Sequence, residues 1–183
     1  MFKTIKNALK TPEIRKRLMY TLLLIVIFRF GCFITVPGVD TLALSELAQA
    51  GTNSLSGFID LISGGAFSRF SIFAMSISPY ITASIIMQLL QMDIIPYFTE
   101  LSKQGPTGRQ KINQITRYLG IFFAFVEGYA FAFAFIGKAG SPMEYMYIST
   151  VLTAGTAFLL WLGDQITQKG IGNGLSLIIM AGI

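Results

Sequence analysis

The chain has 183 residues, of which 53% are hydrophobic and 13% are charged, and its formal net charge is +5. A soluble globular domain carries roughly 25% charged residues, so this composition indicates a membrane protein. The single cysteine and the absence of histidine exclude an intramolecular disulfide and a structural zinc site. The basic residues do not form one face with interleaved aromatics, so we do not expect DNA as a partner.

The N-terminal segment, residues 1–17, combines clustered lysines and arginines with hydrophobic residues at spacings of three and four. This pattern predicts an amphipathic helix on the cytoplasmic membrane surface. The apolar segment 18–36 lacks a small-residue cleavage site, which favours a retained first span over a signal peptide. Arg29 lies inside this span, and two interpretations stay open. Either it faces a polar cavity or partner helix, or its side chain reaches the outer interface.

A polar segment, 37–57, follows the first span and is predicted to be an external loop. The next segment, 58–70, is too short to span a membrane and carries a basic residue, Arg69, yet its apolar residues recur at helix-like spacing. We expect a half-helix folded into a cavity, because irregular backbone exposed to lipid would leave its polar groups unpaired. Ser63-Gly64-Gly65 is expected to break this half-helix.

Residues 71–92 contain no charged residue, and at ~1.5 Å per residue they are long enough to cross a hydrocarbon core of ~30 Å. They are predicted to form the second span. Ile77, Ile81, Ile85 and Gln88 fall on one face of that helix. Branched aliphatic side chains on a pore wall exclude ions and water, although packing against lipid explains the same periodicity equally well.

The rest of the chain alternates apolar spans with polar connections. In order, these are a cytoplasmic loop (93–116), a third span (117–136), an external loop (137–147), a fourth span (148–166), a cytoplasmic turn (167–173) and the start of a fifth span (174–183). Since the fifth span is incomplete, we expect the intact protein to continue. Gly170, Gly172 and Gly174 are expected to let the chain turn sharply back into the membrane, because no strand precedes them as a dinucleotide loop requires.

Glu127 lies in the middle of the third span, where a carboxylate is by default a candidate functional group. It is an ion relay, part of a polar helix contact that opens and closes, or a protonated or hydrogen-bonded packing residue. Basic residues otherwise gather in the segments on the N-terminal side of the membrane, with Arg69 and Lys138 on the outer side. The positive-inside rule therefore places the N-terminus in the cytoplasm.

No set of catalytic residues is recognisable, because the sequence has no histidine, no metal-ligand cluster and no phosphate loop in a suitable context. We therefore expect no enzymatic activity and no cofactor. Two classes of protein remain. One is a secondary transporter with a small-solute or ion site at a broken helix, and the other is a channel closed by a hydrophobic constriction.

Four stretches of the sequence resemble the N-terminal half of the SecY family, the protein-conducting channels of the bacterial Sec translocon. They are PGVD at 37–40, SGGAFSRFSIFAMSISPYITASIIMQLL at 63–90, KQGPTGRQKINQITRY at 103–118 and WLGDQITQKGIGNGLSLIIMAGI at 161–183. The resemblance covers essentially the whole chain. It implies an all-α fold, a polytopic transmembrane helix bundle that is the N-terminal half of an inverted-repeat ten-helix channel in the plasma membrane of a bacterium.

The resemblance also implies roles for particular residues. The implied plug, which closes the outer funnel, contains Phe58, Ile59, Leu61, Ile62, Ser63, Gly64, Gly65, Ala66, Phe67 and Arg69. The implied pore ring consists of Ile77, Ile81, Leu175 and Ile179. The implied lateral gate carries Thr82, Gln88 and Glu127, and the implied cytoplasmic loop contacts are Lys103, Arg109 and Lys111.

The function implied by the resemblance is the passage of unfolded polypeptides across the membrane and the lateral release of hydrophobic segments into lipid. The implied partners are signal sequences and unfolded substrate polypeptides, SecE-type and SecG-type subunits, the SecA motor ATPase, the ribosome, membrane lipid and the C-terminal half of the same channel. The energy for transport would come from these partners, since no covalent chemistry is expected on this chain.

Overall fold

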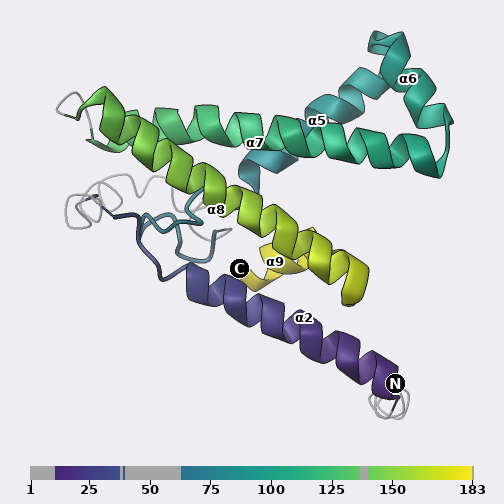
Figure 1. The fold of residues 1–183 in the computed structure, drawn as a ribbon, viewed down its shortest axis with the longest axis horizontal. Coiled ribbons are helices and arrows are strands. Elements are labelled where there is room, and N and C mark those ends of the chain that lie inside the picture. Colours follow the sequence, from purple (N-terminus) through teal and green to yellow (C-terminus); the bar gives the residue numbers. More distant parts are fainter. Residues whose placement is uncertain (1–10, 38, 40–62, 137–139, 183) are drawn as a thin grey trace. The chain divides into compact units, whose positions relative to one another are not determined.

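The computed structural model describes residues 11–37, 39, 63–136 and 140–182. Its helices are α2 (Pro12–Gly31), α5 (Ser78–Leu89), the π-helix η1 (Leu90–Ile94), α6 (Pro96–Lys103), α7 (Pro106–Ile136), α8 (Pro142–Lys169) and α9 (Gly174–Gly182) (Figure 1). Among the described residues, the β pairing consists of one isolated antiparallel bridge between Thr35 and Ser71. The predicted all-α fold class is confirmed.

Proline residues mark the beginnings of most of these helices. Pro12, Pro96, Pro106 and Pro142 are the first residues of α2, α6, α7 and α8, and Pro79 is the second residue of α5. Proline suits the first turn because its missing N–H group would have no partner there and its fixed φ is helical. At α8 a capping box adds to this effect. The N–H group of Ser141 donates to Oε2 of Glu144 at 2.9 Å, and the N–H group of Glu144 donates to Oγ of Ser141 at 3.3 Å.

The helices differ in length from the predicted spans. The structure places them at 12–31 instead of 18–36, at 106–136 instead of 117–136, and at 142–169 instead of 148–166. The predicted loop 93–116 thus contains η1, α6 and the first turns of α7. Hydropathy locates the apolar part of a helix, whereas a helix continues as long as its caps and tertiary packing support it.

The second span does not begin at residue 71 as predicted. Residues 64–77 form turns, and α5 begins at Ser78. Two features interrupt the helix. The backbone of Ser71 and Ile72 is paired with the segment around Thr35, and Ser76 has a φ of 51°, in the left-handed region.

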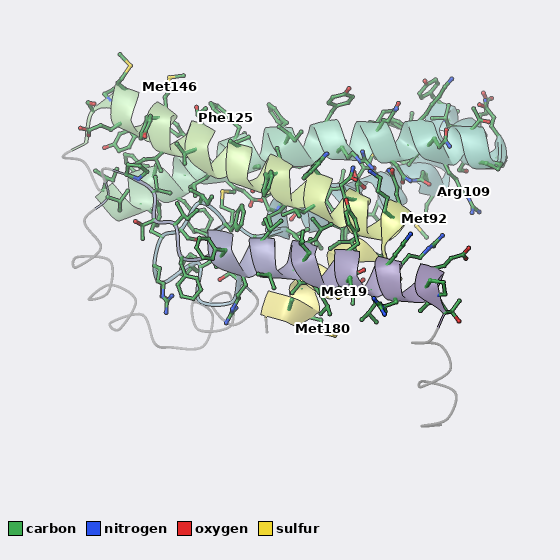
Figure 2. All side chains as sticks on the ribbon, turned by 60° about the horizontal axis from the view of Figure 1, so that its bottom comes forward. Met19, Met92, Arg109, Phe125, Met146 and Met180 are labelled. Atoms are coloured by element: carbon green, nitrogen blue, oxygen red, sulfur yellow. The ribbon has the colours of Figure 1, made fainter. Side chains whose placement is uncertain are left out.

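The chain divides into two compact units, which we describe separately. The first contains Met1–Ala74 and Phe158–Ile183, and the second contains Met75–Ala157, so α8 contributes to both. In the first unit, α2 contacts α9 and buries one face, formed by Thr21, Leu24, Phe28 and Gly31. Other faces of α2 expose large apolar side chains, among them Met19 (Figure 2). Such exposure is typical of a helix that borders lipid.

A row of aromatic rings runs through the first unit. The ring centroids of Phe28 and Phe73 are 6.0 Å apart, those of Phe73 and Phe158 are 6.1 Å apart, and those of Phe158 and Trp161 are 5.7 Å apart. Gly31 makes room for this row, because a methyl group on its α-carbon would collide with the ring of Phe73. The row ties the turns after residue 63 to both α2 and α8.

The chain reverses direction between α8 and α9, as the glycines at 170, 172 and 174 predict. Gly172 has a φ of 76°, and the Oδ1 atom of Asn173 accepts the N–H group of Leu175 at 3.1 Å at the start of α9. The two helices approach closely, since a Cβ atom on Gly174 would collide with the carbonyl oxygen of Gly163. The predicted sharp turn is confirmed.

In the second unit, α5 packs along α7, and α6 folds back against η1 and α7 (Figure 1). The chain bends by 93° between Ser78–Met92 and Pro96–Lys103. Met87 of α5, Leu101 of α6 and Ile112 of α7 are buried together at this corner. This packing makes α6 a folded part of the unit. The prediction of a loop is therefore wrong for these residues.

Two described helices are long and apolar enough to cross a membrane, namely α7 over Pro106–Ala134 and α8 over Pro142–Lys169. The number rises to three if the bent pair of α5 and α6 counts as one span. α2 is not among these helices because it carries several charges, including Arg17 and Arg29, and α9 is not among them because it is short. The four complete spans and partial fifth span stay a prediction.

The tight crossing of α8 and α9 predicts a large effect of Gly174→Ala. The added methyl group would meet backbone atoms of Gly163, which cannot move aside as a flexible side chain does. We expect the free energy of unfolding to fall by about 1–3 kcal/mol, as for other overpacked sites. Thermal unfolding of the purified protein in detergent measures this change. Ser176→Ala on the exposed side of the same helix is the matched control, and equal stability of the two variants would contradict the crossing.

Candidate functional site

The described part of the predicted plug, residues 63–70, is called the plug turn below. Phe58, Ile59, Leu61 and Ile62 lie outside the described residues. The expected half-helix is wrong for residues 64–70, which form turns. Gly64 and Gly65 have φ values of 67° and 77°, which only glycine adopts without strain. The helix-like spacing of the apolar residues was misleading for residues 64–70, and the positive φ values of Gly64 and Gly65 agree with a break at the glycine pair.

Backbone hydrogen bonds attach the plug turn to the chain that follows α2. The N–H group of Val36 donates to the carbonyl of Phe70 at 3.0 Å, and the N–H group of Ile72 donates to the carbonyl of Ile34 at 2.9 Å. Within the turn, the N–H group of Phe67 donates to Oγ of Ser63 at 3.1 Å. These bonds satisfy polar groups of irregular backbone, as an apolar environment requires.

Two arginines add side-chain contacts to the same turn. The Nη1 atom of Arg29 donates to the carbonyl oxygen of Gly64 at 3.2 Å. The guanidinium of Arg69 lies over the ring of Phe33, 4.8 Å from its centroid, in a cation–π contact. Arg29 is exposed, and its partner is a backbone carbonyl of the plug turn, so both interpretations of this residue stay open.

Cys32 lies beneath the plug turn. It is 2% exposed, and its Sγ atom is 3.9 Å from the carbonyl oxygen of Ser63. Cys32 is thus buried against the first residue of the plug turn.

The predicted pore-ring residues form two pairs in different units. In the second unit, Ile77 is buried just before α5, and Ile81 is 42% exposed one turn later. In the first unit, Leu175 and Ile179 lie one turn apart on α9 and are partly buried. Each pair presents aliphatic side chains at a spacing of four, but a common ring stays a prediction because the pairs belong to separate units.

The predicted gate residues all lie in the second unit. Thr82 and Gln88 are exposed on α5, and Oγ1 of Thr82 donates to the carbonyl of Ser78 at 3.3 Å. Glu127 is partly buried on α7 and has no hydrogen bond or ion pair with the described residues. The structure therefore lends no support to a hydrogen-bonded packing role for Glu127.

A polar cavity of about 280 Å³ between α5 and α7 brings Gln88 together with Arg109. Arg109 is labelled on α7 in Figure 2. The cavity is lined by Tyr80, Ser84, Met87, Gln88, Gln91, Arg109, Ile112, Asn113 and Thr116. Gln88 was expected at the lateral gate and Arg109 in a cytoplasmic loop contact, so their shared cavity is a feature that neither expectation contains.

A usable signal for this cavity was present in the sequence. The polar residues of the first set are Ser84 and Gln88 on α5 and Gln91 on η1, and those of the second set are Arg109, Asn113 and Thr116 on α7. In both sets the spacing is four and then three, which places each set on one face. The pairing of the two faces depends on how α5 and α7 pack, and this is not visible in either spacing alone.

The remaining cationic candidates lie at the corner formed by α6 and α7. Lys103 is in the last turn of α6, where a cation interacts favourably with the helix dipole, and Lys111 is exposed on α7. Among the described residues, no group of three or more His, Cys, Asp or Glu side chains could hold a metal ion. The candidate residues of the first unit are thus the plug turn and one aliphatic pair, and those of the second unit are the other aliphatic pair and the polar helix faces.

Comparisons with known proteins fit this arrangement. The SecY family profile matches residues 71–183. The protein translocase subunit SecY of Staphylococcus carnosus (strain TM300) is 50% identical over 190 residues, a match that covers 100% of this chain and 44% of that protein. The chain thus spans less than half the length of that relative.

Two solved structures share the fold. Sec61 in the canine ribosome–channel complex from the endoplasmic reticulum superposes with a TM-score of 0.67 at 21% identity, over 94% of this chain and 37% of that chain. A SecY structure described by its plug domain, which stabilises the closed state of the translocation channel and maintains a membrane seal, gives a TM-score of 0.66 at 21% identity, over 94% of this chain and 36% of that chain. At such identity these likenesses concern the fold alone, but together with the profile match they lead to one conclusion. The chain belongs to the SecY family of protein translocase subunits.

Proposed function

We propose that this chain is the N-terminal part of the central channel subunit of a Sec translocon in the plasma membrane of a bacterium, with its N-terminus in the cytoplasm. It conducts unfolded polypeptides and releases hydrophobic segments sideways into lipid. The observation that carries this proposal is the attachment of the plug turn to the end of α2 in a chain that is 50% identical to a translocase subunit.

The described contacts suit a seal that must open reversibly. The contacts described for the plug turn include hydrogen bonds and a cation–π contact, each of which is individually weak. A signal sequence would enter beside Thr82, Gln88 and Glu127, the plug turn would move away, and the substrate would thread the aliphatic ring. No covalent step on this chain is needed, so we propose no enzymatic activity and no cofactor.

The proposed partners include the C-terminal half of the same channel, SecE-type and SecG-type subunits, the SecA motor ATPase and the ribosome. One structural relative is a channel in complex with the ribosome. Lys103, Arg109 and Lys111 are exposed at the α6–α7 corner, where they suit contact with an anionic partner surface.

No observation favours the alternative, a secondary transporter with a solute site near Arg29 and Glu127. Arg29 donates to a backbone carbonyl of the plug turn, and Glu127 lacks a polar partner among the described residues. A solute carrier would need paired polar ligands at such positions.

Replacing Ile81 and Ile179 with serine in the complete channel should raise the resting ion conductance several-fold. Exclusion of water and ions by a narrow constriction depends on apolar walls, which the hydroxyl groups would disturb. Planar-bilayer recordings of the channel without substrate measure this conductance. Met180→Ser, on the exposed side of α9 next to Ile179, is the control. Equal conductance of the double variant and the unchanged channel would rule out the ring assignment.

Joining the plug turn to α2 should block transport. In a Ser63→Cys variant, a short bifunctional thiol reagent can bridge the new cysteine and Cys32, whose Sγ atom lies 3.9 Å from the carbonyl of residue 63. Translocation of a reporter polypeptide should then stop, because the turn can no longer leave its closed place. The same treatment of Ser102→Cys, on α6, should leave transport intact. Normal transport by the bridged Ser63→Cys channel would refute the plug role.

A further inference from the structure

Arg29 lies in the last turn of α2, among apolar side chains that face outward. Its neighbours Val26, Ile27 and Phe30 are all exposed. A charged side chain in an apolar setting is costly unless it has a polar partner. The carbonyl oxygen of Gly64, 35 positions away in the chain, is that partner at 3.2 Å.

The backbone conformation of Gly64 allows this contact. Its φ of 67° turns the backbone so that its carbonyl meets Arg29, and a Cβ atom at this position would collide with Nη1 of Arg29. The same Cβ atom would lie 2.9 Å from the carbonyl oxygen of Gly182 on α9. Residue 64 is therefore enclosed between α2 and α9, and only glycine fits there.

The other end of the plug turn is held to the same stretch of chain. Arg69 covers the ring of Phe33, and the carbonyl of Phe70 accepts the N–H group of Val36. The backbone bond holds the C-terminal end of the turn, whereas Arg29 alone supplies a charged donor to its glycine end among the described residues.

We propose that Arg29 is a positioning residue for the plug. Its guanidinium donates a hydrogen bond to the carbonyl of Gly64 and so holds the glycine end of the plug turn against α2; this contact is called the clasp below. The hydrogen bond breaks before the turn moves. The inference rests on the proposed function of the plug turn, which it deepens by naming the contact that keeps the turn in place.

The native cysteine provides the test. Cys32 is buried beside Ser63, so its rate of modification by a small methanethiosulfonate reagent follows the opening of the turn. In the reconstituted complete channel, Arg29→Gln should speed this modification about tenfold, the factor expected when a charge-assisted hydrogen bond is lost. Arg29→Lys, which keeps a cationic donor, should restore most of the protection. Arg15→Gln, an exposed arginine near the start of α2, should change nothing.

A second variant tests the other side of the same contact. Gly64→Ala should speed modification at least as much as Arg29→Gln, because its methyl group displaces Arg29, meets the carbonyl oxygen of Gly182 and strains a backbone of positive φ. Adding Arg29→Gln to Gly64→Ala should then speed modification by much less than Arg29→Gln does alone, because the contact is already lost. A full tenfold further increase, or an Arg29→Gln channel as protected as the unchanged one, would overturn the clasp.

Ion conductance of the same variants separates the clasp from the function it serves. Faster modification with a higher resting conductance supports both. Faster modification without added conductance supports the clasp and refutes the plug as the seal. Unchanged modification refutes the clasp whatever the conductance.

Discussion

The structure depends on one constraint, which is that irregular backbone away from water must find hydrogen-bonding partners within the protein. The plug turn meets it through the paired backbone of residues 34–36 and 70–72 and through the arginine at the end of α2. The cost of leaving these groups unpaired holds the turn in place.

Close approach of helices holds each unit together. Lipid offers no hydrophobic drive between apolar helices, so contact depends on small residues that let backbones meet. In the first unit Gly163 faces Gly174, and in the second unit Gly120 faces Tyr80 with only 3.3 Å left for a Cβ atom. Within each unit, glycine thus sets which helix faces touch. The polar cavity between α5 and α7 follows from the same packing, since it forms where the polar faces of two such helices meet.

Much of the candidate site was predictable from local signals. The glycine pair at 64 and 65 and the reversal at Gly170–Gly174 were both anticipated, because positive φ values and tight approaches select glycine for local steric reasons. The helical class followed from composition and from the lengths of the apolar runs. The prolines also mark where most of the helices begin, but bounds predicted from hydropathy did not take them into account.

Other features were not predictable from periodicity. The apolar spacing before and after Arg69 suggested helix, but tertiary pairing with the chain after α2 turned residues 64–77 into a series of turns. The length of α7 was underestimated because a hydropathy window ends where polar residues begin, while Ile112 and Thr116 continue to pack beyond it. Glu127 also differs from its expectation. A carboxylate in the middle of an apolar span marked it as a candidate functional group, but it has no polar partner among the described residues.

The sequence by itself determined the helical membrane class, the glycine turns and the family, because composition and local sterics act through neighbouring residues. Only the tertiary structure decided that Arg29 bonds to Gly64, that Cys32 lies under the same turn, and that Gln88 and Arg109 share a cavity. These contacts join residues far apart in the chain. Their formation depends on how whole helices pack, and no local pattern records that.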